Sequence, residues 1–199
     1  NEMAIKDFLT FAEKDTVPAE AYFQIAIIYY EQDKYTEALS MLDKTLKETP
    51  NDDRLTYKKG VIYYLLGDYD SAINNYTKAI EQNPDNTDAL NDRASCKRKK
   101  EDLKGAIYDY KKAVSIKPDF ALAWNNLGSA QREFEAYSEA IESYNKAISL
   151  DPYNAIYFNN RGYTYFLKNN YPLSIKDFEK AILLKEGYAL AYSNKSATL

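Results

Sequence analysis

The sequence predicts an all-α chain that repeats one pair of helices. Alanines recur at intervals of 34 residues (Ala38, Ala72, Ala106, Ala140), and a proline follows each of them (Pro50, Pro84, Pro118, Pro152). Apolar residues between alanine and proline keep to one helical face, as in the set Ala140, Tyr144, Ala147 and Ile148. A fixed period with this face predicts stacked helical repeats that bury their apolar sides on one another.

The period divides the chain into five repeats of two helices each. With Ala38 as position 20 of a repeat, the repeats are 19–52, 53–86, 87–120, 121–154 and 155–188. Position 8 is small and position 24 is large in each repeat; the small residues are Ala26, Gly60, Ala94, Gly128 and Gly162. Small residues let two helices approach closely, so we expect these two positions to face each other within a repeat.

Partial repeats flank the five complete ones. Residues 1–18 have the pattern of a second helix, and 189–199 have that of a first helix; each is half of a further repeat or a capping helix. We therefore expect residues 1–199 to form a single solenoid. A fragment of a longer solenoid is the preferred interpretation over a complete domain with terminal capping helices. Apolar surface at its two ends predicts that it associates end to end.

The fourth repeat carries the residues that point to a known family. Trp124, Leu127, Gly128, Ala140 and Tyr144 stand where tetratricopeptide repeats have such residues, and the resemblance covers nearly the whole chain. It implies a right-handed superhelical solenoid in which the first helix of each repeat lines a concave groove. Five residues depart from the family pattern: Thr56 replaces an aromatic residue, Arg93 and Arg161 replace a leucine, Lys97 replaces a tyrosine, and Glu186 stands where a proline is expected.

Composition argues against catalysis. The chain has no histidine, which removes the Ser/His and Cys/His nucleophile pairs and the histidine metal ligands, and it has one cysteine and no glycine-rich phosphate loop. We predict no enzyme activity, no metal and no cofactor. A formal charge of −4 argues against indiscriminate nucleic-acid binding, and no apolar run is long enough to span a membrane. We expect a cytoplasmic chain.

Groove positions are apolar in the first two repeats and polar afterwards. An apolar cluster that suits hydrophobic anchors of a partner is expected from Phe23, Ile27, Tyr30, Tyr57, Val61 and Tyr64. The alternative is that residues 1–18, or a missing segment, cover this cluster. Farther along, Asp88, Asp92 and Lys58 are expected to pair with one another, and Arg98 and Arg132 suit an acidic peptide segment.

Asparagines repeat along the last part of the groove. Position 6 holds Asn126, Asn160 and Asn194, and position 5 holds Asn125 and Asn159. Amides can donate to and accept from a peptide backbone, so this row predicts binding of an extended chain, with little effect on stability. The row is similar to the asparagine ladder of the O-linked N-acetylglucosamine transferases. Asparagine as a merely tolerated polar residue is the alternative.

These observations together predict a non-catalytic scaffold that binds a peptide or partner protein in its concave groove. Two alternatives remain open. The chain is a regulatory or substrate-recruiting segment of a larger enzyme such as a glycosyltransferase, or it is a structural subunit that leaves its groove empty.

Overall fold

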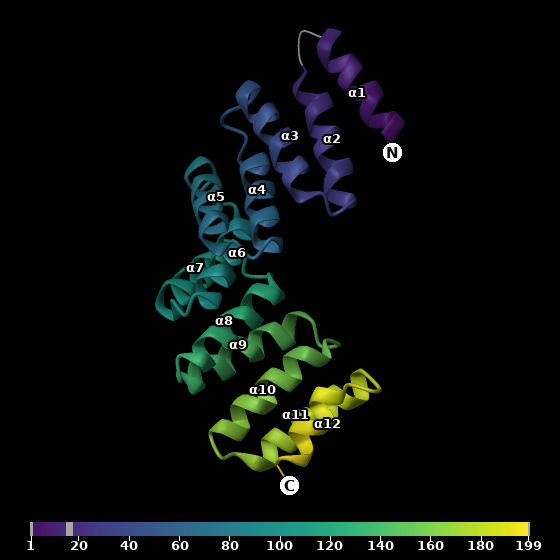
Figure 1. The fold of residues 1–199 in the computed structure, drawn as a ribbon. Coiled ribbons are helices and arrows are strands. Elements are labelled where there is room, and N and C mark those ends of the chain that lie inside the picture. Colours follow the sequence, from purple (N-terminus) through teal and green to yellow (C-terminus); the bar gives the residue numbers. More distant parts are fainter. Residues whose placement is uncertain (1, 15–17, 199) are drawn as a thin grey trace. The chain divides into compact units, whose positions relative to one another are not determined.

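The computed structural model describes residues 2–14 and 18–198, with side chains for 2–10 and 18–198. Within these ranges the chain forms twelve α-helices and no strand, which confirms the all-α prediction (Figure 1). The helices are α1 (Glu2–Lys14), α2 (Ala19–Glu31), α3 (Tyr35–Glu48), α4 (Asp53–Leu65), α5 (Tyr69–Gln82), α6 (Thr87–Lys99), α7 (Leu103–Ile116), α8 (Ala121–Glu133), α9 (Tyr137–Leu150), α10 (Ala155–Leu167), α11 (Tyr171–Leu184) and α12 (Ala189–Ser196).

The helices group into two compact units, Asn1–Cys96 and Lys97–Leu199, which we call the N-terminal and the C-terminal unit. In the N-terminal unit α2 packs on α3 and α4 packs on α5. In the C-terminal unit the same pairing joins α8 to α9 and α10 to α11. Each of these pairs is a helix–turn–helix repeat.

Close contact inside each pair explains the columns of small residues. The alanines at position 20, from Ala38 to Ala140, are 0% exposed. At Gly128 a Cβ atom would lie 2.8 Å from Cε1 of Tyr144, whose ring is fully buried. Position 8 therefore faces position 24 within the repeat, and at Gly128 the ring of Tyr144 leaves no room for a side chain opposite it.

The turn between the two helices of a repeat uses one residue in the left-handed region. These residues are Asp33, Gly67, Glu101, Glu135 and Asn169, with φ between 57° and 77°. Around Glu135, the Ala136 N–H donates to the Gln131 carbonyl at 2.8 Å and the Glu135 N–H to that of Arg132 at 3.0 Å. This pair of bonds closes a helix C-terminus in the Schellman manner, which requires positive φ at the residue after the cap.

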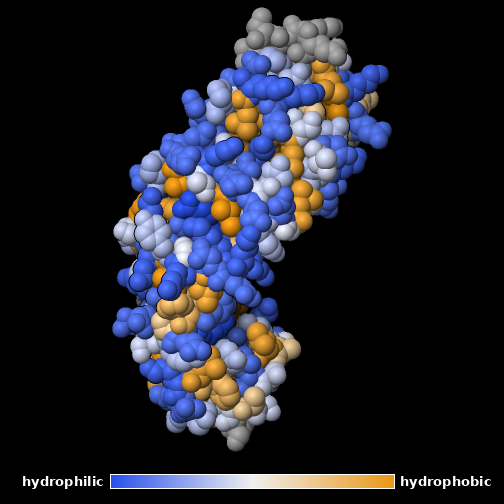
Figure 2. All heavy atoms as spheres, turned by 60° about the vertical axis from the view of Figure 1, so that its left-hand side comes forward, coloured by the Kyte–Doolittle hydropathy of each residue, from blue (hydrophilic) through white to orange (hydrophobic). Residues whose placement is uncertain are grey.

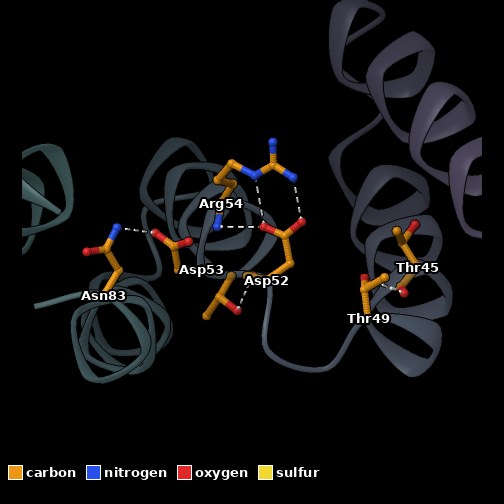
Figure 3. Close-up of polar contacts among 7 residues, drawn as sticks. Thr45, Thr49, Asp52, Asp53, Arg54 and Asn83 are labelled. Carbon is orange, nitrogen blue, oxygen red and sulfur yellow. Dashed lines mark hydrogen bonds and ion pairs between the residues drawn. The ribbon is translucent and has the colours of Figure 1, made fainter.

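Polar side chains fix the connection from one repeat to the next (Figure 3). Asp52 caps α4 by accepting from the Arg54 N–H at 3.0 Å, and the Arg54 guanidinium also binds this carboxylate. These bonds from Arg54 hold the pKa of Asp52 below its ordinary value. Within the repeat 53–86, the Asn83 amide donates to Asp53 at 3.0 Å, so the end of α5 is tied to the start of α4.

Two of the five departures from the family pattern are explained by buried aspartates. In the C-terminal unit Arg161 makes two 2.7 Å hydrogen bonds to Asp177. Lys97 makes one of the same length to Asp109, which is fully buried. In both cases a cationic side chain replaces a leucine or a tyrosine where a buried aspartate lies opposite it. The surface outside such contacts is mostly hydrophilic, with hydrophobic residues in separate patches on the face drawn in Figure 2.

Candidate functional site

The first-helix side chains of the N-terminal unit surround a pocket of about 420 Å³ between α2 and α4. Five of the six residues of the predicted apolar cluster line it, namely Phe23, Ile27, Tyr30, Tyr57 and Val61. The sixth, Tyr64, lies near the end of α4 with its ring 5.6 Å from that of Tyr69. We call this cavity the apolar pocket. Periodicity brings its residues together because they lie at positions 5, 9 and 12 of consecutive first helices.

Tyr57 forms the polar edge of the apolar pocket. Its hydroxyl donates to Asp92 Oδ2 at 2.8 Å, and its ring lies 5.6 Å from that of the buried Tyr76. Burial, followed by the nearby carboxylates of Asp92 and Asp88, raises the pKa of Tyr57. Tyr57 therefore stays a neutral donor and holds the Asp92 carboxylate at the border of the pocket.

The charged residues beside the pocket do not pair as the sequence suggested. Asp92 accepts from Tyr57 and, at 2.9 Å, from the Asn91 amide. Lys58 instead lines the pocket and places its Nζ 5.8 Å from the centroid of the Phe23 ring. The expected network of Asp88, Asp92 and Lys58 is thus absent from the part of the chain that the structure describes. The neutral groups of Tyr57 and Asn91 donate to the Asp92 carboxylate, and Lys58 makes a cation–π contact instead.

Arg98 and Arg132 lie together in the C-terminal unit, as their shared repeat position predicts. Both approach Glu133, with nitrogen–oxygen distances of 3.7 Å from Arg98 and 4.0 Å from Arg132. The Arg132 guanidinium also lies 5.3 Å from the centroid of the Tyr163 ring. Glu133 and Tyr163 were not among the predicted site residues, although both stand at the groove positions 13 and 9. Glu133 offsets part of the positive charge that an acidic ligand would meet.

The asparagine row joins consecutive repeats. The Asn160 amide donates to Asn125 Oδ1 at 2.9 Å, and the Asn194 amide donates to Asn159 Oδ1 at 3.0 Å. Both pairs are 35 residues apart, like Tyr57 and Asp92. Position 5 of one repeat therefore contacts position 6 of the next in both units. The spacing of 35 is visible in the sequence, but the sequence does not distinguish a contact between repeats from a surface for a peptide.

Two members of this row are too enclosed for direct contact with a ligand. Asn125 is 6% exposed and Asn159 is 2% exposed, and each accepts from the next repeat. These two asparagines thus hold repeats together, which corrects their expected role as peptide ligands. Asn126, Asn160 and Asn194 are half-buried, so part of each side chain still reaches the surface.

The described residues do not support a metal site, a membrane-spanning helix or a reactive cysteine. No group of three histidine, cysteine, aspartate or glutamate side chains in the described part of the chain could hold a metal ion. None of the described helices has the length and apolarity to cross a membrane; the longest have 14 residues, whereas a span takes about 20. Cys96 is fully buried, and burial raises the pKa of its thiol to about 12, which disfavours the reactive thiolate at neutral pH.

Comparison with known families agrees with the repeat geometry. Models described as "Tetratricopeptide repeat" match residues 19–52, 55–86 and 155–188, and one described as "TPR repeat" matches residues 97–133 and 135–169. The chain belongs to the tetratricopeptide repeat family. No curated protein matches it by sequence.

Solved structures of tetratricopeptide repeat proteins resemble the chain over nearly its whole length. YrrB, described as a TPR protein with an unusual peptide-binding site, is 24% identical with a TM-score of 0.78, covering 95% of this chain and 97% of YrrB. MamA 41-end from Desulfovibrio magneticus RS-1 is 25% identical with a TM-score of 0.80, covering 86% and 97%. TTC0263 of Thermus thermophilus is 16% identical with a TM-score of 0.67, covering 90% and 98%. These likenesses support the repeat fold.

Proposed function

We propose that the chain is a non-catalytic interaction scaffold and that the apolar pocket anchors a peptide or a segment of a partner protein. The observation that carries this proposal is the pocket itself. Five groove side chains from two repeats border about 420 Å³ of open space, and Tyr30 remains 40% exposed beside it. Aromatic and branched side chains that surround a concave pocket are the usual anchors of protein recognition.

The fold supports the same function. Repeats present the first-helix side chains side by side, so a ligand in an extended or helical conformation can contact several repeats at once. A solved relative, YrrB, is described as having a peptide-binding site. The half-buried Asn126, Asn160 and Asn194, together with Arg98 and Arg132, are candidates for polar contacts in the C-terminal unit.

Selection from a library of random peptides on the purified chain tests this proposal. We expect enriched peptides whose binding weakens about tenfold in the variant Tyr30→Ala, because exposed tyrosines at the centre of an interface often carry this much affinity. Tyr108→Ala is the matched control, since Tyr108 is 68% exposed on α7 in the other unit. If no enriched peptide depends on Tyr30, the apolar pocket is not the binding site.

A further inference from the structure

The apolar pocket is bordered by an excess of negative charge. Glu31 lines the pocket, Asp92 is hydrogen-bonded to the lining residue Tyr57, and Asp88 stands one helical turn before Asp92 on α6. One cation, Lys58, lines the same pocket, and its ammonium group lies against the Phe23 ring. The pocket lining thus holds one carboxylate and one ammonium group, and two more carboxylates, Asp92 and Asp88, act on the lining residue Tyr57 from α6.

The two aspartates are not neutralised within the protein. Among residues 2–10 and 18–198, neither Asp88 nor Asp92 has an ion-pair partner, and the donors to Asp92 are the neutral Tyr57 and Asn91. Burial raises the pKa of Asp92, and the neighbouring charge of Asp88 adds to this effect. A partly buried carboxylate without a cation gains when a partner supplies one, because its lost hydration is then repaid.

We propose that the apolar pocket takes a bulky apolar side chain of a basic peptide segment, and that Asp88 and Asp92 bind a lysine or arginine close to this anchor in the peptide. This inference rests on the proposed function and names its ligand class. The pocket has room for one large side chain, and Tyr57 places the carboxylate of Asp92 directly beside it. The Asp92 carboxylate lies 2.8 Å from the hydroxyl of the lining residue Tyr57, so the basic residue stands close to the anchor in the peptide.

Charge variants separate this inference from the general proposal. Peptides selected on the unmodified chain are remade with glutamine in place of their basic residue, and both forms are titrated against the parent and against the double variant Asp88→Asn/Asp92→Asn. Asparagine keeps the shape of aspartate and can still accept from Tyr57, so the fold has little reason to change. The matched control is Glu48→Gln/Glu81→Gln, which removes two exposed carboxylates of the same unit from α3 and α5.

We expect the parent and the control to prefer the basic peptide about tenfold and the Asp88→Asn/Asp92→Asn variant to lose this preference. Selected peptides that are acidic, or whose basic residue can be replaced without loss, overturn the charge assignment; if they still depend on Tyr30, the scaffold function stands. Binding that depends neither on the basic residue of the peptide nor on Tyr30 overturns both the basic ligand and the pocket as the binding site. A dimer of the chain that dissociates in Tyr30→Ala would assign the pocket to a second copy and overturn the inference. The glutamine peptides keep the test decisive even if the double variant misfolds.

Discussion

Replacing Arg161 by leucine should lower the free energy of unfolding by more than the removal of an exposed ion pair would. Arg161 donates through Nε and Nη2 to the two oxygens of Asp177, both at 2.7 Å, and through Nη1 to Asn145 at 2.6 Å. The Asp177 side chain is 7% exposed. The fourth repeat holds Leu127 at the position of Arg161 and Ser143 at that of Asp177, so the repeat tolerates an uncharged pair at this site.

The burial of the aspartate determines the expected magnitude. Arg161→Leu removes the cation and leaves a buried carboxylate without a partner, which costs about 3–5 kcal/mol in the free energy of unfolding. Arg161→Leu/Asp177→Ser instead copies the fourth repeat and removes that carboxylate. We expect this double variant to recover all but about 1–2 kcal/mol of the loss, because no buried charge remains.

Urea unfolding of the parent, of Arg161→Leu, of Asp177→Ser and of the double variant measures the coupling between the two positions. Lys195→Leu is the control, since Lys195 occupies the same repeat position but pairs with Glu179, whose side chain is 55% exposed. That exposed pair should contribute at most about 1 kcal/mol. The reasoning is refuted if Arg161→Leu costs no more than the control, or if the double variant loses the sum of the single losses.

Three further substitutions and one labelling experiment test other parts of the structure. Asn160→Ala should lower stability by about 0.5–1.5 kcal/mol in urea unfolding, because it leaves the buried Asn125 acceptor unpaired; an unchanged midpoint would return the row to a purely surface role. Glu135→Gly should raise the melting temperature and increase the free energy of unfolding by about 1 kcal/mol, since φ is 62° there and glycine adopts this conformation without strain. Gly128→Leu should cost about 1–3 kcal/mol by overpacking, and a parental melting temperature would contradict the close contact seen at position 8. Cys96 should react with a thiol reagent at neutral pH no faster than the chain unfolds, because it is 0% exposed and burial raises its pKa to about 12; fast labelling of the folded chain would show a more open α6.

Periodicity made most of the candidate site predictable. Phe23, Ile27, Tyr30, Tyr57 and Val61 were expected together because positions one repeat apart on a helical stack must lie side by side. The same logic placed Arg98 beside Arg132. It failed where the outcome depends on which of several polar neighbours a side chain reaches. Asp92 binds Tyr57 rather than Lys58, and Asn125 accepts from Asn160 of the next repeat rather than facing a ligand.

The amino-acid sequence by itself determined the helices, their pairing and the columns of small and large residues, since each follows from local period and side-chain volume. Tertiary structure decided the partners of the polar residues. Arg161 departs from the family pattern as a single letter, and its role is apparent only with Asp177 opposite it. A hydrogen bond or ion pair depends on distance and direction within a few tenths of an ångström and on burial, whereas an apolar contact needs only proximity and volume. The repeated sequence therefore specifies the apolar contacts in every repeat, whereas the hydrogen bonds and ion pairs are defined only by the packed side chains.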